Sequence, residues 1–354
     1  MNNVIEKLEN NDEFTLDEAV KLYDLDLSKL GKVAQRIRLN KFGKKTYFNI
    51  NRHINPSNVC KDVCKFCAFS AHRKNPNPYT LSIEECVEIA KNAYNNGAKE
   101  VHIVSAHNPN VGYEYYMNIV KEIKNALPAI HIKAFTAAEV NFFSELSGKT
   151  YGEVLEDMAK AGVDSMPGGG AEIFDEEVRN KICKGKVSSE NYLKIHKIWH
   201  KMGKKSNVTM LFGHIENRAH RVEHMLRVKK LQDETGGFNA FIPLVYQRKN
   251  NYLNVTKFLT GVEILKTIAI SRILLKNIPN IKAYWVTTTL NLSLVAQEYG
   301  ANDIDGTIEK ESINSAAGAA SSNGVGLEEL VSLIKDSGFI PVERDSLYNE
   351  LKIY

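Results

Sequence analysis

The sequence predicts an α/β protein whose core is a (β/α)8 barrel of the TIM type. Eight short runs rich in β-branched and aromatic residues alternate with amphipathic stretches of about ten to twenty residues. This alternation is typical of βαβ units, which build parallel sheets, and eight such units match the barrel. A doubly wound open sheet is the alternative. It would be favoured by a Gly-x-Gly-x-x-Gly pattern after the first strand, and the sequence has none there.

Each element has a local reason. The residues before the first strand read as helices, and one of them begins at a capping box formed by Thr15 and Glu18. Ser82 and Glu85 repeat that pattern at the start of a barrel helix. The expected strands are 47–54, 101–105, 130–136, 163–166, 208–212, 238–245, 281–287 and 304–308.

The domain organisation follows from these elements. We expect an N-terminal helical extension over 1–45 and the barrel over 46–310. A C-terminal extension of helix and loop, over 311–354, is expected to pack on the barrel.

The composition narrows the class of protein. The chain has 354 residues, of which 43% are hydrophobic and 25% charged, as in an ordinary globular protein. The net charge of +4 is small and its lysines are scattered, which argues against a nucleic-acid partner. The apolar stretch 261–275 is interrupted by charged residues, so no membrane span is expected. Five cysteines, three of them clustered, do not form a secreted disulfide framework, and a start without a signal peptide completes the expectation of a cytoplasmic protein.

Three of the cysteines form the most informative motif. Cys60, Cys64 and Cys67 have the spacing C-x3-C-x2-C, with Phe66 just before the third. Three thiolates within eight residues can converge on one metal centre, and a [4Fe–4S] cluster held by three cysteines leaves one iron open to another ligand. A zinc site is the alternative, with His53 or His72 as fourth ligand. A simple electron carrier would need a fourth cysteine nearby.

Further unusual residues follow the predicted strands. In a (β/α)8 barrel the carboxyl ends of the strands meet at one rim, where active sites lie. The cysteine loop follows the first strand and therefore lies at that rim. The other residues expected there are His53, Asn55, His107, Glu139, the stretch 167–172 and the stretch 213–216.

Several of these residues have both a functional and a structural interpretation. Phe66 and Phe69 are expected to shield a cluster from water. Three glycines at 168–170 allow close approach to a ligand but lack the Lys-Ser/Thr of a phosphate loop. Glu172 either binds ribose hydroxyls or an ammonium, or complements a helix dipole. His214 is a candidate general base or a hydrogen-bonded structural residue.

The motifs resemble a known family. The cysteine run is the signature of radical S-adenosylmethionine (SAM) enzymes, and longer segments resemble the aminofutalosine synthase family of the futalosine route to menaquinone. These segments are 133–139, 164–174, 231–238, 240–244, 282–286 and 341–348. The resemblance runs from about residue 15 to the C-terminus. The chain departs from the usual Gly-Gly after the second strand, where it has Ser105-Ala106, and this changes how the methionine amino group of SAM would be approached.

The resemblance implies a site and a reaction. Cys60, Cys64 and Cys67 would hold the [4Fe–4S] cluster, and SAM would be the co-substrate. The residues implied near SAM are Phe66, Phe69, Ser105, Glu139, Glu172, Gly213 and Glu216. The adenosyl radical would add to 3-[(1-carboxyvinyl)oxy]benzoate, with aryl migration and loss of carbon dioxide, giving 6-amino-6-deoxyfutalosine and methionine. A flavodoxin or ferredoxin would supply the electron.

The aromatic dicarboxylate substrate needs cationic partners. The candidates near predicted strand ends are Arg52, Arg73 and Arg248. The candidate catalytic residues are His214 and Arg248.

Other functions remain open at this stage. One is cyclic dehypoxanthine futalosine synthase, or a deazaflavin-cofactor synthase, in which the adenosyl radical would abstract hydrogen. The other is a zinc or electron-transfer protein without catalysis.

The first testable prediction concerns the cysteines. Replacing Cys60, Cys64 or Cys67 by Ala should abolish cluster assembly, because only these three have ligand-like spacing. Cys86→Ala and Cys183→Ala are the matched controls and should retain the cluster. Iron and sulfide content and visible absorbance after anaerobic purification measure the effect, and a cluster retained in Cys64→Ala would overturn the assignment.

Overall fold

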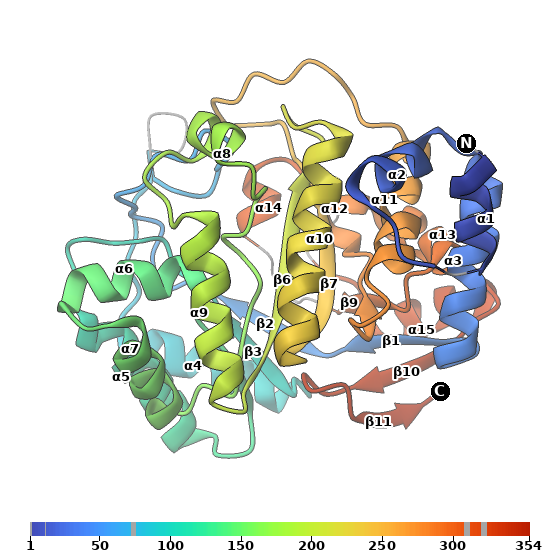
Figure 1. Cartoon of the computed structure of the whole chain (residues 1–354). Helices are drawn as coiled ribbons and strands as arrows, with labels where there is room; N and C mark the ends of the chain where they lie inside the picture. Colours follow the sequence, from blue (N-terminus) through green and yellow to red (C-terminus); the bar gives the residue numbers. More distant parts are fainter. Residues whose placement is uncertain (1, 11, 72–75, 308–311, 320–323) are drawn as a thin grey trace.

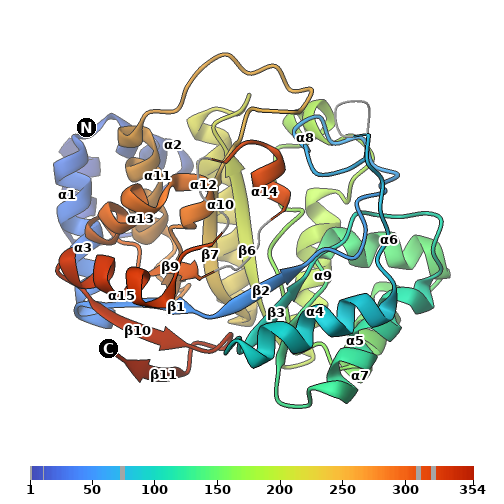
Figure 2. The ribbon, with the colours of Figure 1, turned by 180° about the vertical axis from the view of Figure 1, so that it is seen from behind.

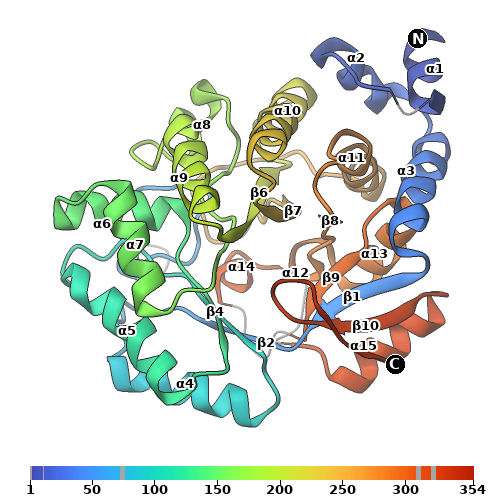
Figure 3. The same ribbon diagram turned by 60° about the horizontal axis from the view of Figure 1, so that its bottom comes forward.

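The computed structural model describes residues 2–10, 12–71, 76–307, 312–319 and 324–354. Its core is a curled sheet of seven parallel strands in the order β2-β3-β4-β5-β6-β7-β8. Helices surround these strands, as Figure 3 shows in a view toward one end of the ring. The seven strands are β2 (Asn51–Ile54), β3 (Glu100–Ile103), β4 (His131–Lys133), β5 (Ser165–Met166), β6 (Lys205–Phe212), β7 (Phe238–Val245) and β8 (Asn280–Ile281).

A second sheet leads from the last strand of the curl back to the first. It has the order β11-β10-β1-β9, with strands β1 (Lys45–Asn49), β9 (Asp303–Gly306), β10 (Ile340–Arg344) and β11 (Glu350–Ile353). A bridge between Lys282 and Asp303 links the end of β8 to β9, and β9 pairs in parallel with β1. Only Ile50 separates β1 from β2. The first barrel strand is therefore bent, with one half in each sheet.

The helices lie on the outside of the strands (Figure 1). Helices α4 to α9 follow β2 to β5 along the chain, and α10 and α11 follow β6 and β7. Their bounds are α4 (Ile83–Asn95), α5 (Tyr113–Ala126), α6 (Ala137–Ser147), α7 (Tyr151–Ala161), α8 (Glu176–Ile182), α9 (Ser189–Lys201), α10 (Arg218–Thr235) and α11 (Gly261–Leu274). Between β8 and β9 the chain forms α12 (Trp285–Thr288), α13 (Leu290–Val295) and η2 (Ala296–Tyr299). None of the helices described is long and apolar enough to cross a membrane.

The N-terminal helical extension is present and is tied to the barrel. It contains α1 (Asn2–Asn10), α2 (Leu16–Lys21), η1 (Leu22–Asp24) and α3 (Leu27–Phe42). The capping boxes at Thr15 and Ser82 both form. The buried guanidinium of Arg38 on α3 donates to the carbonyl oxygens of Gly43 (2.6 Å), Lys45 (2.6 Å) and Ala301 (3.1 Å). These bonds fix where β1 begins.

Two expected details differ in the structure. The run 281–287 forms only the short strand β8, because the chain turns into helix α12 at Trp285. The C-terminal segment, expected as helix and loop, has α14 (Ile313–Ala316) and α15 (Leu327–Asp336), and it adds β10 and β11 beside β1 (Figure 2). The eighth run matches β9, and its last residue, 308, lies outside the described residues.

A buried polar cluster joins α9, β6 and the end of α10. The hydroxyl of Ser206 contacts His196 Nδ1 at 2.9 Å and His200 Nε2 at 2.7 Å, and Thr235 lies 2.7 Å from the other ring nitrogen of His200. A Cβ at Gly237 would lie 2.0 Å from the His200 ring, so only glycine fits there. Burial lowers the pKa of His200 to about 4 and that of His196 well below its ordinary value.

This cluster predicts acid destabilisation. The unfolded chain protonates a histidine near pH 6.5, whereas folded His200 stays neutral down to about pH 4. The unfolded state therefore binds more protons in this window, and the free energy of unfolding should fall as pH falls, by up to about 1.4 kcal/mol per pH unit for each such histidine. Urea titrations at several pH values between 7 and 4 give the free energy of unfolding. Its dependence on pH should be shallower for His200→Gln than for the wild type. The control His220→Gln, at the start of α10, should keep the wild-type slope, and equal slopes in all three proteins would contradict the account.

Candidate active site

The three cysteines lie on the wall of one cavity inside the barrel. This barrel cavity has a volume of about 290 Å³ and runs from the cysteine loop down to side chains of β2, β3 and β4. The three cysteines are half buried, and the amide of Ser70 donates to the sulfur of Cys67 at 3.4 Å. Burial raises the pKa of Cys60 and Cys64, so the protein alone does not favour thiolates, and a bound cation would have to stabilise them.

The cysteine loop is held from two sides. Asp62 forms an ion pair with His107 Nδ1 at 2.9 Å, and the amide of Lys61 donates to the carbonyl of His107 at 2.9 Å. His107 stacks on Phe142, with ring centroids 5.0 Å apart. On the other side the amide of Lys65 donates to the carbonyl of Ile182 at the end of α8. The loop is thus anchored to the β3–α5 connection and to α8.

The donor set fits an iron–sulfur group better than zinc. Three thiols face one cavity, and within the described residues no group of three or more His, Cys, Asp or Glu side chains already converges as a metal site. His53, proposed as a fourth zinc ligand, lies lower in the barrel, with its ring 4.6 Å from that of His102. His72 lies outside the described residues. Three cysteines on one cavity wall are the number of protein ligands in a cluster that leaves one iron open.

Both predicted aromatic residues line the barrel cavity. Phe69 is buried and meets Tyr79 edge to face, with ring centroids 6.4 Å apart. Phe66 also lines the cavity, and the ammonium of Lys186 lies 5.6 Å from its ring centroid.

Ser105 lines the cavity, and Glu139 holds it there. One carboxylate oxygen of Glu139 accepts the amide of Ser105 at 2.7 Å. The other accepts the amide and the hydroxyl of Thr136, which caps α6, both at 2.7 Å. Glu139 is buried, which raises its pKa to about 7, and it does not itself line the cavity. It is a residue that positions the end of β3.

The glycine stretch after β5 brings Glu172 to the cavity. A Cβ at Gly168 would lie 2.7 Å from the backbone of Val208, so the chain passes β6 at close range. Glu172 has a φ of +47°, in the left-handed region that non-glycine residues seldom adopt. Its carbonyl accepts the amide of Leu211 at 2.7 Å, and this bond holds the turn. Strained backbone of this kind is often found at functional sites.

Lys186 was missed by the sequence analysis. Its ammonium lies 2.7 Å from the carboxylate of Glu172, and both residues line the cavity beside Phe66. Burial opposes the charge of Lys186, but Glu172 and the neighbouring thiols hold its pKa well above the ordinary value. Nothing local distinguishes Lys186 from the other lysines of the chain, because its partners come from other segments.

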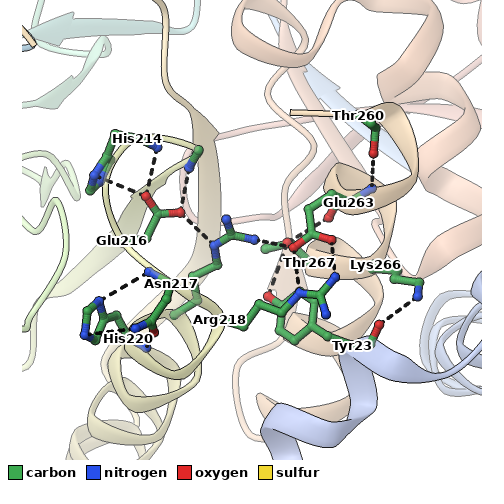
Figure 4. Close-up of polar contacts among 12 residues, drawn as sticks. Tyr23, His214, Glu216, Asn217, Arg218, His220, Thr260, Glu263, Lys266 and Thr267 are labelled. Carbon is green, nitrogen blue, oxygen red and sulfur yellow. Dashed lines mark hydrogen bonds and ion pairs between the residues drawn. The ribbon is translucent and has the colours of Figure 1, made fainter. Parts of the chain in front are cut away.

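Three of the predicted site residues lie away from the barrel cavity: Gly213, His214 and Glu216. They line a second, outer cavity between the end of β6 and the starts of α10 and α11, and they do not line the barrel cavity. The Glu216 carboxylate accepts the amides of Gly213 and His214 and pairs with Arg221 at 2.7 Å (Figure 4). The side chains of His214 and Glu216 are fully buried and 3.1 Å apart. Protein groups therefore already occupy the positions where we expected a ligand.

An ion-pair network extends from Glu216 to the N-terminal extension. Arg221 pairs with Glu263 of α11 at 2.9 Å, Glu263 pairs with Arg218 at 2.8 Å, and Arg218 reaches Asp24 at 3.2 Å. The two guanidinium groups lie over the ring of Tyr23 (Figure 4). The network joins α10, α11 and η1, so its role is structural.

The two expected substrate-binding arginines that the structure describes, Arg52 and Arg248, do not line the barrel cavity. Arg248 lies over the ring of Phe258, 3.2 Å from its centroid. Arg52 lies between Asn51 and His53, which both face the cavity, so its position on β2 points to the other face of the sheet. Arg73 lies outside the described residues. The cationic side chains that do line the cavity are Lys133, Lys186 and Lys282.

Comparisons with known proteins agree with this site. The sequence model of the Radical SAM superfamily matches residues 54–228, and that of the CofH/MqnC C-terminal region matches residues 235–354. The structure of the [FeFe]-hydrogenase maturase HydG from Carboxydothermus hydrogenoformans superposes with a TM-score of 0.77 at 18% identity, covering 98% of this chain and 80% of that one. That likeness establishes the fold.

Sequence relatives define the family more narrowly. Aminodeoxyfutalosine synthase of Thermus thermophilus is 40% identical over 99% of this chain and 96% of its own. A 5-amino-6-(D-ribitylamino)uracil–L-tyrosine 4-hydroxyphenyl transferase of Methanopyrus kandleri is 36% identical over 93% of this chain and 91% of its own. Cyclic dehypoxanthine futalosine synthase of Halalkalibacterium halodurans is 34% identical over 99% and 95%. The chain is therefore a radical SAM enzyme, and it belongs to the aminodeoxyfutalosine synthase family.

Proposed function

We propose that this enzyme joins the adenosyl group of SAM to 3-[(1-carboxyvinyl)oxy]benzoate in menaquinone biosynthesis, in the cytoplasm. One observation carries the proposal: a single cavity connects the three cysteines with Lys133 and Lys282 deep in the barrel. The radical would form at the cysteine end, and a dianionic substrate would find cations at the other. The 40% identity with an aminodeoxyfutalosine synthase supports the same conclusion.

Cys60, Cys64 and Cys67 would hold a [4Fe–4S] cluster and leave one iron open for the amino and carboxylate groups of SAM. When bound and reduced, the cluster supplies the electron that cleaves SAM to methionine and a 5′-deoxyadenosyl radical. A flavodoxin or ferredoxin is the proposed reductant.

The residues near the cysteines suit the charged groups of SAM. Lys186 offers N–H donors to a carboxylate, and Glu172 offers acceptors to an ammonium or to ribose hydroxyls. The two are paired with each other at 2.7 Å, so each has a partner when SAM is absent. Phe69 is the proposed contact of the adenine ring, and Ser105, fixed by Glu139, replaces the usual glycine at the amino group. We propose a supporting role for three residues on the outer cavity, which hold the end of β6 in place: Gly213, His214 and Glu216.

The proposed reaction consumes SAM. The radical adds to the terminal carbon of the enol ether, and the aryl group migrates from oxygen to carbon. Carbon dioxide leaves, the one electron given up would return to the cluster that supplied it, and the products are 6-amino-6-deoxyfutalosine and methionine. The protein has to exclude water and other hydrogen donors while it holds the two carbons in contact. Side chains of Ile242, Leu244 and Tyr284 on the cavity wall suit this task.

A second function remains within the same superfamily. In a cyclic dehypoxanthine futalosine synthase or a deazaflavin-cofactor synthase the adenosyl radical would abstract hydrogen. The relatives named for other reactions support this candidate, because they are still 36% and 34% identical to nearly the whole chain.

The product distinguishes the two functions. Reconstituted protein incubated with dithionite, SAM and 3-[(1-carboxyvinyl)oxy]benzoate should give an adenosyl adduct with the mass of 6-amino-6-deoxyfutalosine. A Cys64→Ala protein is the control and should give none. Formation of 5′-deoxyadenosine without the adduct would reject the proposed function and favour the second one.

Glu172 and Glu216 should behave differently. Glu172→Gln should weaken SAM binding by about ten- to a hundred-fold, the cost of a lost charged hydrogen bond, and leave the iron–sulfur absorbance unchanged. Glu216→Gln should leave SAM binding intact and lower the free energy of unfolding by about 1–3 kcal/mol, because its partners are protein groups. Equilibrium binding and thermal melts check both, and unaltered SAM binding in Glu172→Gln would remove it from the site.

A further inference from the structure

The interior of this barrel is charged where most such barrels are apolar. Layers of bulky aliphatic side chains usually fill the centre of a (β/α)8 barrel. Here β2, β3 and β4 place His53, His102 and Lys133 side by side in register. All three line the barrel cavity, together with Lys282 and Asp305 from the opposite side. Burying charged groups costs free energy unless they are paired. The partners of these side chains therefore show which of their polar atoms are left for a ligand.

Each lysine has a carboxylate as its nearest charged partner. Lys133 lies 2.7 Å from Glu100, and Lys282 lies 3.1 Å from Asp305. We call these four residues the barrel floor. An ammonium has three N–H groups, and each of these lysines makes one side-chain hydrogen bond among the residues described. Donors therefore remain on both lysines, and both side chains line the cavity.

The C-terminal segment closes the barrel beneath the floor. Ser346 donates to Glu100, and Arg344 of β10 pairs with Asp303 at 2.6 Å. Asp303 lies 4.0 Å from Lys282. These contacts give Glu100 and Asp303 further partners from the C-terminal segment.

His102 adds a neutral group above the floor. Its Nε2 is buried and has no hydrogen-bond partner within the described part of the chain. Burial, together with the neighbouring His53 and Lys133, lowers the pKa of His102 well below its ordinary value, so the ring is uncharged at neutral pH. A ligand oxygen in the cavity could form a hydrogen bond with this nitrogen. Because the ring is neutral, His102 would not add a third positive charge beside the two lysines.

The direction of the reaction decides which end of the substrate reaches the floor. The vinyl carbon has to meet the adenosyl group, and SAM binds at the cysteine end of the cavity in the proposed function. The benzoate carboxylate lies on the far side of the aromatic ring from the vinyl group. It is therefore the group that points away from the cysteines and down the barrel.

We propose that Lys133 and Lys282 bind the aromatic carboxylate of the substrate at the barrel floor and so anchor the ring during migration. This inference rests on the proposed function and adds the subsite that recognises the substrate. The arginines at the rim are not needed for it.

Binding without turnover tests the subsite. The holoenzyme with cluster and SAM, but no reductant, is titrated with 3-[(1-carboxyvinyl)oxy]benzoate and with the analogue whose ring carboxylate is a carboxamide. The wild type should bind the acid about ten- to a hundred-fold more tightly than the amide, as expected for charged hydrogen bonds. Lys133→Gln and Lys282→Gln should each lose most of this preference through weaker acid binding. Lys205→Gln, an exposed lysine at the start of β6, should keep it.

Paired variants separate recognition from folding. Lys282→Gln leaves Asp305 without its partner, so Lys282→Gln/Asp305→Asn removes both charges together, and Lys133→Gln/Glu100→Gln does the same on the other side. Loss of the acid preference in folded paired variants supports the subsite. An acid preference retained in the folded paired variants, while the wild type forms the adenosyl adduct, would overturn the subsite and leave the proposed function standing. A wild type that binds neither ligand would overturn both.

Discussion

The pairing of buried charges is the constraint on which this structure depends. The barrel cavity contains lysine and carboxylate side chains that would each lose favourable hydration on burial. Lys186 forms an ion pair with Glu172 near the cysteines, and Lys133 forms one with Glu100 on the floor, each at 2.7 Å. Removing one member of such a pair typically costs about 3–5 kcal/mol, because a charge is left uncompensated. The cavity is thus stable only as a set of pairs.

The bent first strand connects this cavity to the rest of the chain. β1 pairs with β9 and β10, and β2 pairs with β3, with only Ile50 between them. The cysteine loop continues from β2, whereas the residues that support the floor come from β9 and β10. The two matched sequence regions divide along similar lines: residues 54–228 contain the cysteines, Glu172 and Lys186, and residues 235–354 contain Lys282, Asp305 and Arg344. The barrel floor combines Lys133 and Glu100 of the first region with Lys282 and Asp305 of the second, so the cavity is built from both.

Much of the fold could be predicted from the sequence, because local patterns determine it. The β-branched runs and the capping boxes at Thr15 and Ser82 depend on near neighbours, and the structure confirms them. The run 281–287 was overestimated because a buried turn and short helix are as apolar as a strand. Strand β10 depends on pairing with β1, about 300 residues away in sequence, and β11 pairs with β10, so no local pattern reveals this part of the sheet.

The site was predictable only in part, for a related reason. Closely spaced cysteines are visible in a sequence, but Lys133, Lys186 and Lys282 are distinguished only by the cavity that they share. Glu216 follows a glycine at a strand end, as Glu172 does, yet Arg221 and two backbone amides of its own turn bind it. The facing of alternate residues also excludes Arg52, whose neighbours Asn51 and His53 line the cavity.

The central claim is that three cysteines hold a cluster whose open iron faces SAM in this cavity. Mössbauer spectroscopy of protein reconstituted with ⁵⁷Fe and sulfide, recorded with and without SAM, tests it most directly. The account predicts a [4Fe–4S] spectrum in which SAM changes the signal of one iron site. A spectrum that SAM leaves unaltered, or protein that contains zinc without sulfide, would contradict it.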